Sequence, residues 1–485
     1  MPDPANTSLQ LDEMKSAMNA IDRHSDPQKD GSRSNDTNHP IHDNDEDPFS
    51  TPRPRPSSTI STSPSKSIFS QGLARGGSSV SLPSPAQSPT RRSQSTTSTH
   101  TRSKSPMKQT DDLIKLDKPV RWEELSTDEL LATMRQYHSE ALLQSIYKVL
   151  RKGYLPRELR GILDKELNLD DSDDACYAER SPRPVPESQL RQATFLVGTA
   201  FGSLFPPIQQ DETSKVNELL PNFIHLQSLL SELEALRAIV ATTRDHLNIT
   251  RTEASWNELV HRPMLDLTVT NHPGIGVENV TRANIASVFL PPTSVGDLSL
   301  PSDSRLIDYA MVLRPVPPPR RVRAKTSVKN AHDGNKLSND RIVKFVDMLE
   351  HQTFNQSRYK PLCKMPSGVF IETKAVLKSA EAQTQLGLWL ASWYGRVSQF
   401  PCGKGNDNVL PPPVIPVLIV EAALWELYFA FDMGSHYDVC GPVTIGGTRE
   451  LSEAYRLLAV LRILAHWMET DFSKWVENCL QQAGV

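Results

Sequence analysis

The run Val369-Phe-Ile-Glu-Thr-Lys-Ala375 is apolar at its start and then carries an acid and a base two residues apart. Its β-branched and aromatic residues predict a strand. Side chains alternate between the two faces of a strand, so Glu372 and Lys374 share one face. Ile371 and Thr373 share the other. A mostly buried strand that shows an acid and a base on one face is a candidate site.

A second run, Leu306-Ile-Asp-Tyr-Ala-Met-Val-Leu313, also predicts a strand and is apolar at nearly every position except Asp308. An acid in such a run is costly to bury unless it is paired or binds a cation. Asp308, Glu372 and the backbone carbonyl of Thr373 would supply the oxygen ligands that Mg²⁺ prefers. Lys374 would orient a water molecule or neutralise charge on a phosphodiester. The residues alone leave the alternative of a surface ion pair beside a satisfied Asp.

The sequence around these two strands predicts an α/β domain over residues 251–485. Glu253–Leu267 predicts a helix that Pro263 should kink or interrupt. Further predicted elements are a short helix at 339–350, a helix at 380–400, strands at 415–420 and 427–431, and a closing helix pair at 452–480. Gln385 and Trp389 share one face of the 380–400 helix.

Several of these segments together resemble the fungal PD-(D/E)XK nuclease-like domain proteins. They are Ser255-Trp-Asn-Glu-Leu-Val-His-Arg-Pro-Met-Leu265, Ile307-Asp-Tyr309, Ile371-Glu-Thr-Lys374, Gln383-Thr-Gln-Leu-Gly-Leu-Trp389, and Ile445-Gly-Gly-Thr448 with Tyr455. The resemblance covers roughly residues 120–480. It implies a restriction-endonuclease-like fold, which is a mixed central sheet flanked by helices.

The resemblance also implies roles for individual residues. Asp308 matches the Asp of the family motif, and Glu372 and Lys374 match its Glu-x-Lys. Gln385 is similar to the helix glutamine of the RecB-like branch, and Glu258 is a looser match to a first-helix acid that would join the metal ligands. Three features depart from the pattern: Ile307 replaces the motif proline, 64 residues separate Asp308 from Glu372, and Glu421-Ala-Ala-Leu-Trp425 lacks a Gly-His-like pair.

A basic segment follows the Asp308 strand. It holds no acid between Val316 and Ala331. A cationic loop beside a phosphodiester-cleaving site would contact phosphates without reading sequence. The residues predicted to make these contacts are Arg320, Arg321, Arg323 and Lys325. The alternative is an ordinary solvated loop.

The first 250 residues divide into a tail and a helical part. Residues 1–50 hold 11 acidic and 4 basic side chains, whereas residues 51–110 hold 9 basic and no acidic ones. Such a chain buries too little apolar surface to offset ordering, which predicts a disordered Ser/Pro/Thr-rich tail over 1–115. Its Ser-Pro and Arg-Ser sites would be substrates of protein kinases. Residues 116–250 predict a helical subdomain that begins at a capping box at Ser126, with long helices at 189–205 and 216–246.

Composition excludes other classes. The start Met1-Pro-Asp-Pro lacks the basic and apolar regions of a secretory signal, and the longest apolar run, 414–425, is too short to span a bilayer. Five dispersed cysteines without a CxxC pair indicate reduced thiols and no zinc knuckle. We therefore expect an intracellular protein of the nucleus or cytoplasm, neither secreted nor in a membrane.

These patterns predict a nuclease that hydrolyses phosphodiester bonds in DNA or RNA and depends on Mg²⁺, with Mn²⁺ as the alternative ion. The competing hypothesis is a catalytically degenerate nuclease fold. Such a protein would bind nucleic acid or protein, and phosphorylation of its tail would regulate that binding. The sequence leaves the oligomeric state open.

Overall fold

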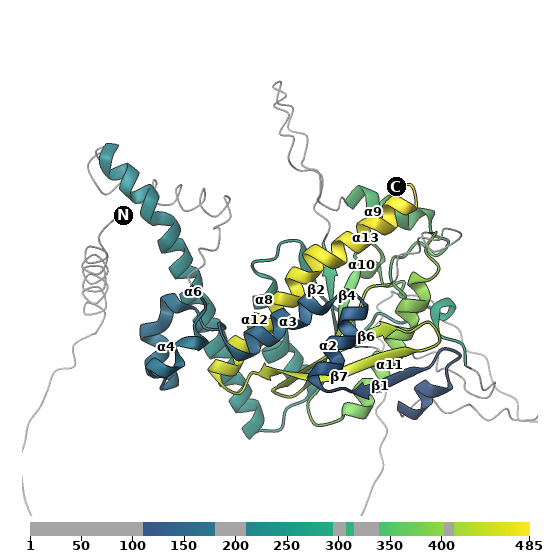
Figure 1. The fold of residues 1–485 in the computed structure, drawn as a ribbon, viewed down its shortest axis with the longest axis horizontal. Coiled ribbons are helices and arrows are strands. Elements are labelled where there is room, and N and C mark those ends of the chain that lie inside the picture. Colours follow the sequence, from purple (N-terminus) through teal and green to yellow (C-terminus); the bar gives the residue numbers. More distant parts are fainter. Residues whose placement is uncertain (1–109, 180–209, 294–306, 315–338, 402–411) are drawn as a thin grey trace, which may run out of the picture. The chain divides into compact units, whose positions relative to one another are not determined.

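The computed structural model describes residues 110–179, 210–293, 307–314, 339–401 and 412–485 (Figure 1). All of the described residues belong to one compact unit, Thr96–Val485. The predicted helix at 189–205 and the basic segment lie outside the described residues.

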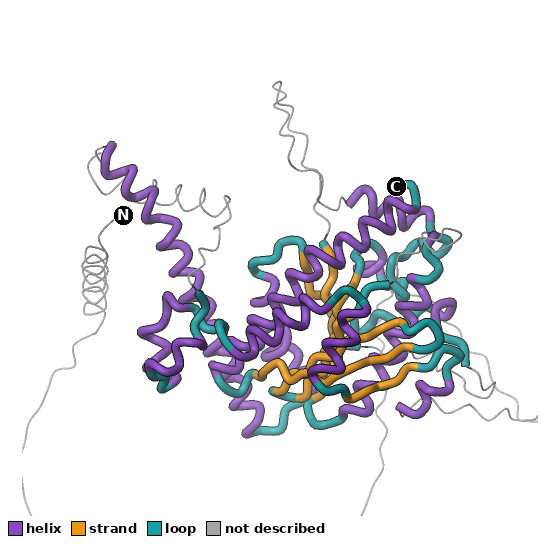
Figure 2. Tube along the Cα trace, in the orientation of Figure 1, coloured by secondary structure: helices purple, strands orange, loops and turns teal. Residues whose placement is uncertain are grey.

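A seven-stranded mixed sheet organises the described residues (Figure 2). Its strands, in chain order, are β1 (Val120–Glu124), β2 (Ile275–Asn279), β3 (Tyr309–Leu313), β4 (Ser367–Lys374), β5 (Ile415–Glu421), β6 (Leu424–Asp432) and β7 (Tyr437–Gly447). Their order across the sheet is β1-β7-β6-β5-β4-β3-β2. The pairs β1/β7 and β4/β5 are parallel, and the others are antiparallel.

Burial explains why the central strands could be predicted. Every residue of β3, β4 and β5 is buried, and apolar runs make up β3, most of β5 and the middle of β4. The strands predicted around residues 306–313, 369–375, 415–420 and 427–431 are therefore confirmed. The sequence did not predict β1, β2 and β7.

Helices pack on this sheet. α11 (Ser379–Val397) contacts β4 and β5, and α12 (Leu451–Trp467) contacts β7. The chain closes with the π-helical turn η7 (Met468–Phe472) and α13 (Ser473–Gln482), while α9 (Asn339–Met348) and α10 (Lys360–Cys363) precede β4. The predicted helices at 339–350, 380–400 and 452–480 are thus confirmed with small shifts of their ends.

The N-terminal part of the described chain is mainly helical. They are the 3₁₀-helix η1 (Thr110–Lys115), α2 (Thr127–Gln136), α3 (Glu140–Arg151), η2 (Arg157–Leu159), α4 (Arg160–Leu167), η3 (Asp171–Cys176) and α6 (Gln210–Asn248). The capping box at Ser126 forms as predicted and begins α2, and His138 between α2 and α3 has a left-handed φ of 54°. β1 joins the same sheet as the later strands, and α3 packs on α12 near the end of the chain. The boundaries at residues 115 and 250 stay predictions; η1 begins at Thr110.

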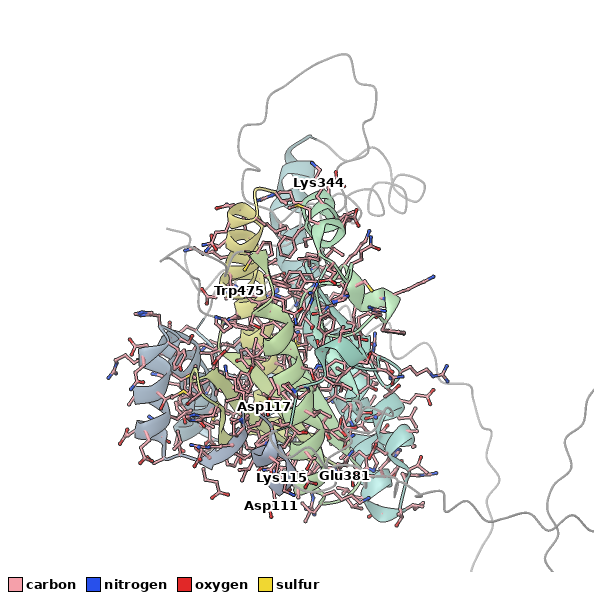
Figure 3. The ribbon with its side chains drawn as sticks, turned by 90° about the vertical axis from the view of Figure 1, so that its right-hand side faces the viewer. Asp111, Lys115, Asp117, Lys344, Glu381 and Trp475 are labelled. Carbon is pink, nitrogen blue, oxygen red and sulfur yellow. The ribbon has the colours of Figure 1, made fainter. Side chains whose placement is uncertain are left out.

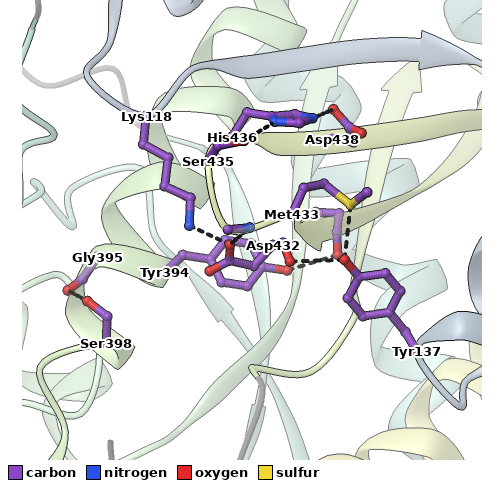
Figure 4. Close-up of polar contacts among 12 residues, drawn as sticks. Lys118, Tyr137, Tyr394, Gly395, Ser398, Asp432, Met433, Ser435, His436 and Asp438 are labelled. Atoms are coloured by element: carbon purple, nitrogen blue, oxygen red, sulfur yellow. Dashed lines mark hydrogen bonds and ion pairs between the residues drawn. The ribbon is translucent and has the colours of Figure 1, made fainter. Parts of the chain in front are cut away.

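Polar contacts fasten the start of β1 to the turn between β6 and β7 (Figure 4). The Lys118 ammonium pairs with Asp432 and lies 4.1 Å from the centre of the Tyr437 ring. The Tyr137 hydroxyl donates to the Asp432 carbonyl at 3.0 Å. His436 Nε2, in the turn, lies 3.3 Å from the Asp438 carboxylate of β7. The Lys118 contacts help to hold the parallel β1/β7 pair, which no short turn connects.

Candidate active site

The segment between α6 and β2 forms one wall of the site. It runs through α7 (Glu253–Trp256), the π-helical turn η4 (Asn257–His261) and α8 (Arg262–Val269). Pro263 lacks an N–H and cannot complete the regular helical ladder. The sequence predicted a kink or an interruption at this proline, and the regular α-helix is interrupted just before it. The helix widens there, so that the Arg262 N–H donates to the Asn257 carbonyl five residues back.

Asp308 and Glu372 lie side by side at one end of the sheet. Tyr309 pairs with Ile371 in the antiparallel β3/β4 ladder, and the Asp308 N–H donates to the Ile371 carbonyl at 3.1 Å. The two acids therefore occupy adjacent positions on neighbouring strands. Their exposed fractions are only 6% for Asp308 and 1% for Glu372.

Hydrogen bonds position Asp308. Its Oδ2 accepts the Thr373 backbone N–H at 3.0 Å and lies 2.8 Å from the Thr373 hydroxyl. That hydroxyl also lies 2.6 Å from Asn257 Oδ1, which connects both residues to η4. Burial nevertheless raises the pKa of Asp308, although these hydrogen bonds and Lys374 act in the opposite direction.

Lys374 joins Glu372 to the helical wall. Its ammonium pairs with Glu372 Oε1 and lies 3.7 Å from Glu253 Oε2. Burial, with the Asp308 charge as a second cause, raises the pKa of Glu372 well above its ordinary value. Burial also raises the pKa of Glu253. Burial by itself would lower the pKa of Lys374, but Glu372 and the other nearby acids raise it, so the ammonium stays charged.

One carboxylate oxygen at this site lacks a hydrogen-bond partner among the described residues, and a divalent cation would satisfy it. Glu372 Oε2 is buried and accepts no hydrogen bond from any residue that the structure describes. A buried carboxylate oxygen without a donor is costly, and a hard cation would satisfy it. Within the described ranges, however, no three His, Cys, Asp or Glu side chains gather into a ready metal cluster. The fit rests on two carboxylates and backbone oxygen.

The structure brings some predicted residues together and not others. Gln385 is half-buried on α11, one turn before Trp389, whose ring centre lies 6.1 Å from that of Phe370. Phe370 and Glu372 share a face of β4, so Gln385 lies on the Glu372 side of the helix. Glu258 is exposed, and the acid that this segment places beside Lys374 is Glu253.

Arg320, Arg321, Arg323 and Lys325, the predicted phosphate contacts, lie outside the described residues. Sequence reasoning also missed the roles of Asn257 and the Thr373 side chain. The one signal for Glu253 was its place in the first turn after Thr252, whose side chain caps the helix.

A buried histidine fastens the wall to the turn that follows β5. His261 Nε2 lies 2.8 Å from the Ala422 carbonyl, and Nδ1 lies 2.9 Å from Asn257 Oδ1. The Ala422 N–H donates to the Lys374 carbonyl at 2.7 Å. Helix, turn and β4 thus meet around Lys374. The Ala-Ala turn stands where the sequence resemblance led us to expect a Gly-His-like pair.

Comparison with known proteins identifies one family. The family model of the PD-(D/E)XK nuclease superfamily matches residues 203–473, more than half of the chain, and this span includes Asp308 and the Glu372-Thr-Lys374 motif. No curated protein and no solved structure matches the chain. None of the helices in the described part of the chain has the length and apolar character needed to cross a bilayer. With its mixed sheet flanked by helices in the expected restriction-endonuclease-like arrangement, the chain belongs to the PD-(D/E)XK nuclease superfamily.

Proposed function

We propose that this protein is a metal-dependent nuclease that hydrolyses phosphodiester bonds in nucleic acid. The observation that supports this function is the buried pair Asp308 and Glu372, with the Lys374 ammonium between Glu372 and Glu253. Two acids with raised pKa values at one place are unstable as anions unless positive charge compensates them. Lys374 supplies part of that charge, and a divalent cation would supply the rest.

Asp308, Glu372 and the Thr373 backbone carbonyl would hold the ion, which is Mg²⁺ or Mn²⁺. Bound there, the ion would polarise the scissile phosphate. Lys374 remains protonated and donates a hydrogen bond to the phosphate or to the attacking water. Glu253 is a positioning residue because it holds the Lys374 ammonium from the helical wall. Gln385 would support the site from α11.

Arg320, Arg321, Arg323 and Lys325 would contribute phosphate contacts outside the metal site. Such contacts add affinity that does not depend on sequence and that weakens as salt rises. They predict that nucleic-acid binding persists when the metal site is disabled.

A cleavage assay tests the proposal. Supercoiled plasmid, single-stranded DNA and RNA are incubated with the full chain in Mg²⁺ or Mn²⁺. We expect Lys374→Ala to reduce the rate by about 100-fold or more, as loss of a single charge-stabilising donor does elsewhere. Glu258→Gln, at an exposed position on the same wall, is the matched control and should cleave like the wild type. Equal cleavage by the wild type and Lys374→Ala would mean that the activity belongs to a contaminant.

A second candidate function is that of a degenerate nuclease fold that binds nucleic acid or protein, under control of tail phosphorylation by kinases. The absence of a three-residue metal cluster among the described residues favours it. Thermal unfolding separates the two candidates. A nuclease should gain stability from millimolar Mg²⁺ or Mn²⁺, and Glu372→Gln should lose that gain. A binding module should show no gain from either ion.

A further inference from the structure

A pocket of about 450 Å³ lies away from the proposed metal site, between η1, β1, α11 and the β6/β7 pair. Its aromatic lining comes from Trp122 on β1 and Tyr428 on β6, whose rings meet edge to face with centres 5.1 Å apart. Pro442 extends this apolar surface. The pocket therefore offers an aromatic and apolar surface to a ligand.

The charges at this pocket are mainly negative. Asp111, Glu123 and Glu124 line it, and Arg121 is the one base among the described residues of the lining. None of these three carboxylates forms a salt bridge with a residue in the described ranges. Burial raises the pKa of Tyr428, so its hydroxyl stays protonated, and it donates to Glu426 at 2.9 Å. Unpaired acids beside aromatic rings favour an organic cation such as a lysine or arginine side chain.

The chain carries such cations directly beside the pocket. Residues 96–109 include Arg102, Lys104 and Lys108 and no acid, and they lead straight into Thr110, which lines the pocket. Thr110 is the eighth residue after Arg102, a reach of at most about 28 Å. A tether this short gives an effective concentration on the order of millimolar. Even if the pocket binds these side chains weakly, the tethered segment would occupy it for much of the time within one molecule.

We propose that the pocket bounded by Trp122, Tyr428 and the acids Glu123 and Glu124 binds the basic side chains of residues 96–109 of the same chain. Phosphate on Ser103 or Ser105 would place negative charge beside those acids and would release the segment. The pocket thus gives the phosphorylatable segment a docking site on the folded body. This inference does not depend on nuclease activity.

The pocket also borders the helix that faces the proposed metal site. Gln383 of α11 lines the pocket, while Gln385 lies on the Glu372 side of the same helix. Asp111 and Glu381, the latter near the start of α11, lie toward the same end of the body (Figure 3). A docked segment would therefore sit beside the first turns of α11.

Photo-crosslinking in the full chain tests the proposal. A benzophenone amino acid replaces Gln383, which is far in sequence from the tether, and mass spectrometry maps its crosslinks. We expect them in residues 96–109. Glu123→Gln combined with Glu124→Gln should reduce their yield about fivefold, because two exposed ion pairs are lost. Glu179→Gln combined with Asp471→Asn, two exposed acids outside the pocket, is the charge-matched control and should keep the yield.

Two further measurements sharpen the result. Raising NaCl from 0.05 to about 0.5 M should lower the yield as the charges become screened. Ser103→Glu with Ser105→Glu should lower it as well. Crosslinks that map to other segments or to a second copy would overturn the proposal. So would a yield that the Glu123→Gln and Glu124→Gln pair leaves unchanged.

Discussion

Acid should loosen the wall of the candidate site through His261. This ring is fully buried, and its two nitrogens lie within 3 Å of the Ala422 carbonyl and of Asn257 Oδ1. Burial lowers its pKa from an ordinary value near 6.5 to about 4. The folded protein therefore resists protonation of a group that the unfolded chain protonates readily.

The sign and size of the effect come from this difference. Between pH 6.5 and 4 the unfolded state binds more protons, so the His261 contribution is complete above pH 6.5 and is lost as pH falls toward 4. A shift of 2.5 pKa units corresponds to about 3 kcal/mol over the full range. About 2 kcal/mol of this should be lost between pH 7.5 and pH 5.

Urea denaturation at pH 7.5, 6 and 5 measures this loss. The buried acids, including Asp308 and Glu372, change stability in the opposite direction because their pKa values are raised and charging them at higher pH is unfavourable. We therefore compare the wild type with His261→Gln, in which these opposing effects cancel. The variant should lose about 2 kcal/mol less than the wild type on going to pH 5. His466→Gln, at an exposed position, controls for removal of a histidine as such. Parallel pH curves for wild type and His261→Gln would refute the reasoning.

Two further predictions concern packing and turn geometry. A Cβ at Gly387 on α11 would lie 2.5 Å from Leu113 Cδ1, so Gly387→Ala should destabilise the protein by about 1 to 2 kcal/mol in urea titrations. Gly395→Ala on the same helix meets no atom within 4 Å and should instead stabilise it by about 0.5 to 1 kcal/mol; equal effects would contradict the packing of η1 on α11. Ala422 has a φ of 53°, a backbone conformation that costs less for glycine than for alanine. Ala422→Gly should therefore raise the free energy of unfolding by about 1 kcal/mol and raise the thermal midpoint. A lower midpoint would count against strain at this turn.

The strands that could be predicted from the sequence are those that contain several consecutive apolar residues. β3, β4 and β5 are buried throughout, so an apolar run identifies each of them. β1 has one buried residue in five and becomes a strand because Val120–Glu124 pairs with β7, more than 300 residues later. β7 alternates buried and more exposed positions in part and contains Pro442. Local pattern cannot reveal pairing of this range.

The site shows the same limit. Strand alternation predicted that Glu372 and Lys374 share a face, and in the structure they form an ion pair. This relation could be predicted because the two residues are close in sequence. The contribution of the helical wall is not local, because packing between distant parts of the chain decides which face of the segment meets the sheet. Glu253 and Asn257, four residues apart on one helical face, contact Lys374 and Thr373 of β4, whereas Glu258 is exposed. Helical spacing relates Glu253 to Asn257, but it does not reveal that this face meets β4.

The proposed metal site and the pocket lined by Glu123 and Glu124 differ in the burial of their acids, and this difference determines which cations each can bind. At the proposed metal site the acids are buried and Lys374 is held between two of them, so a ligand must bring concentrated positive charge to offset desolvation. At the pocket, Glu123 and Glu124 are exposed, and water already stabilises their charges. An organic cation can join them with little desolvation, and salt will weaken that contact far more than it weakens a buried pair. Moderate salt should thus separate tail docking from metal binding in the same chain, because screening acts at the surface and burial protects the site.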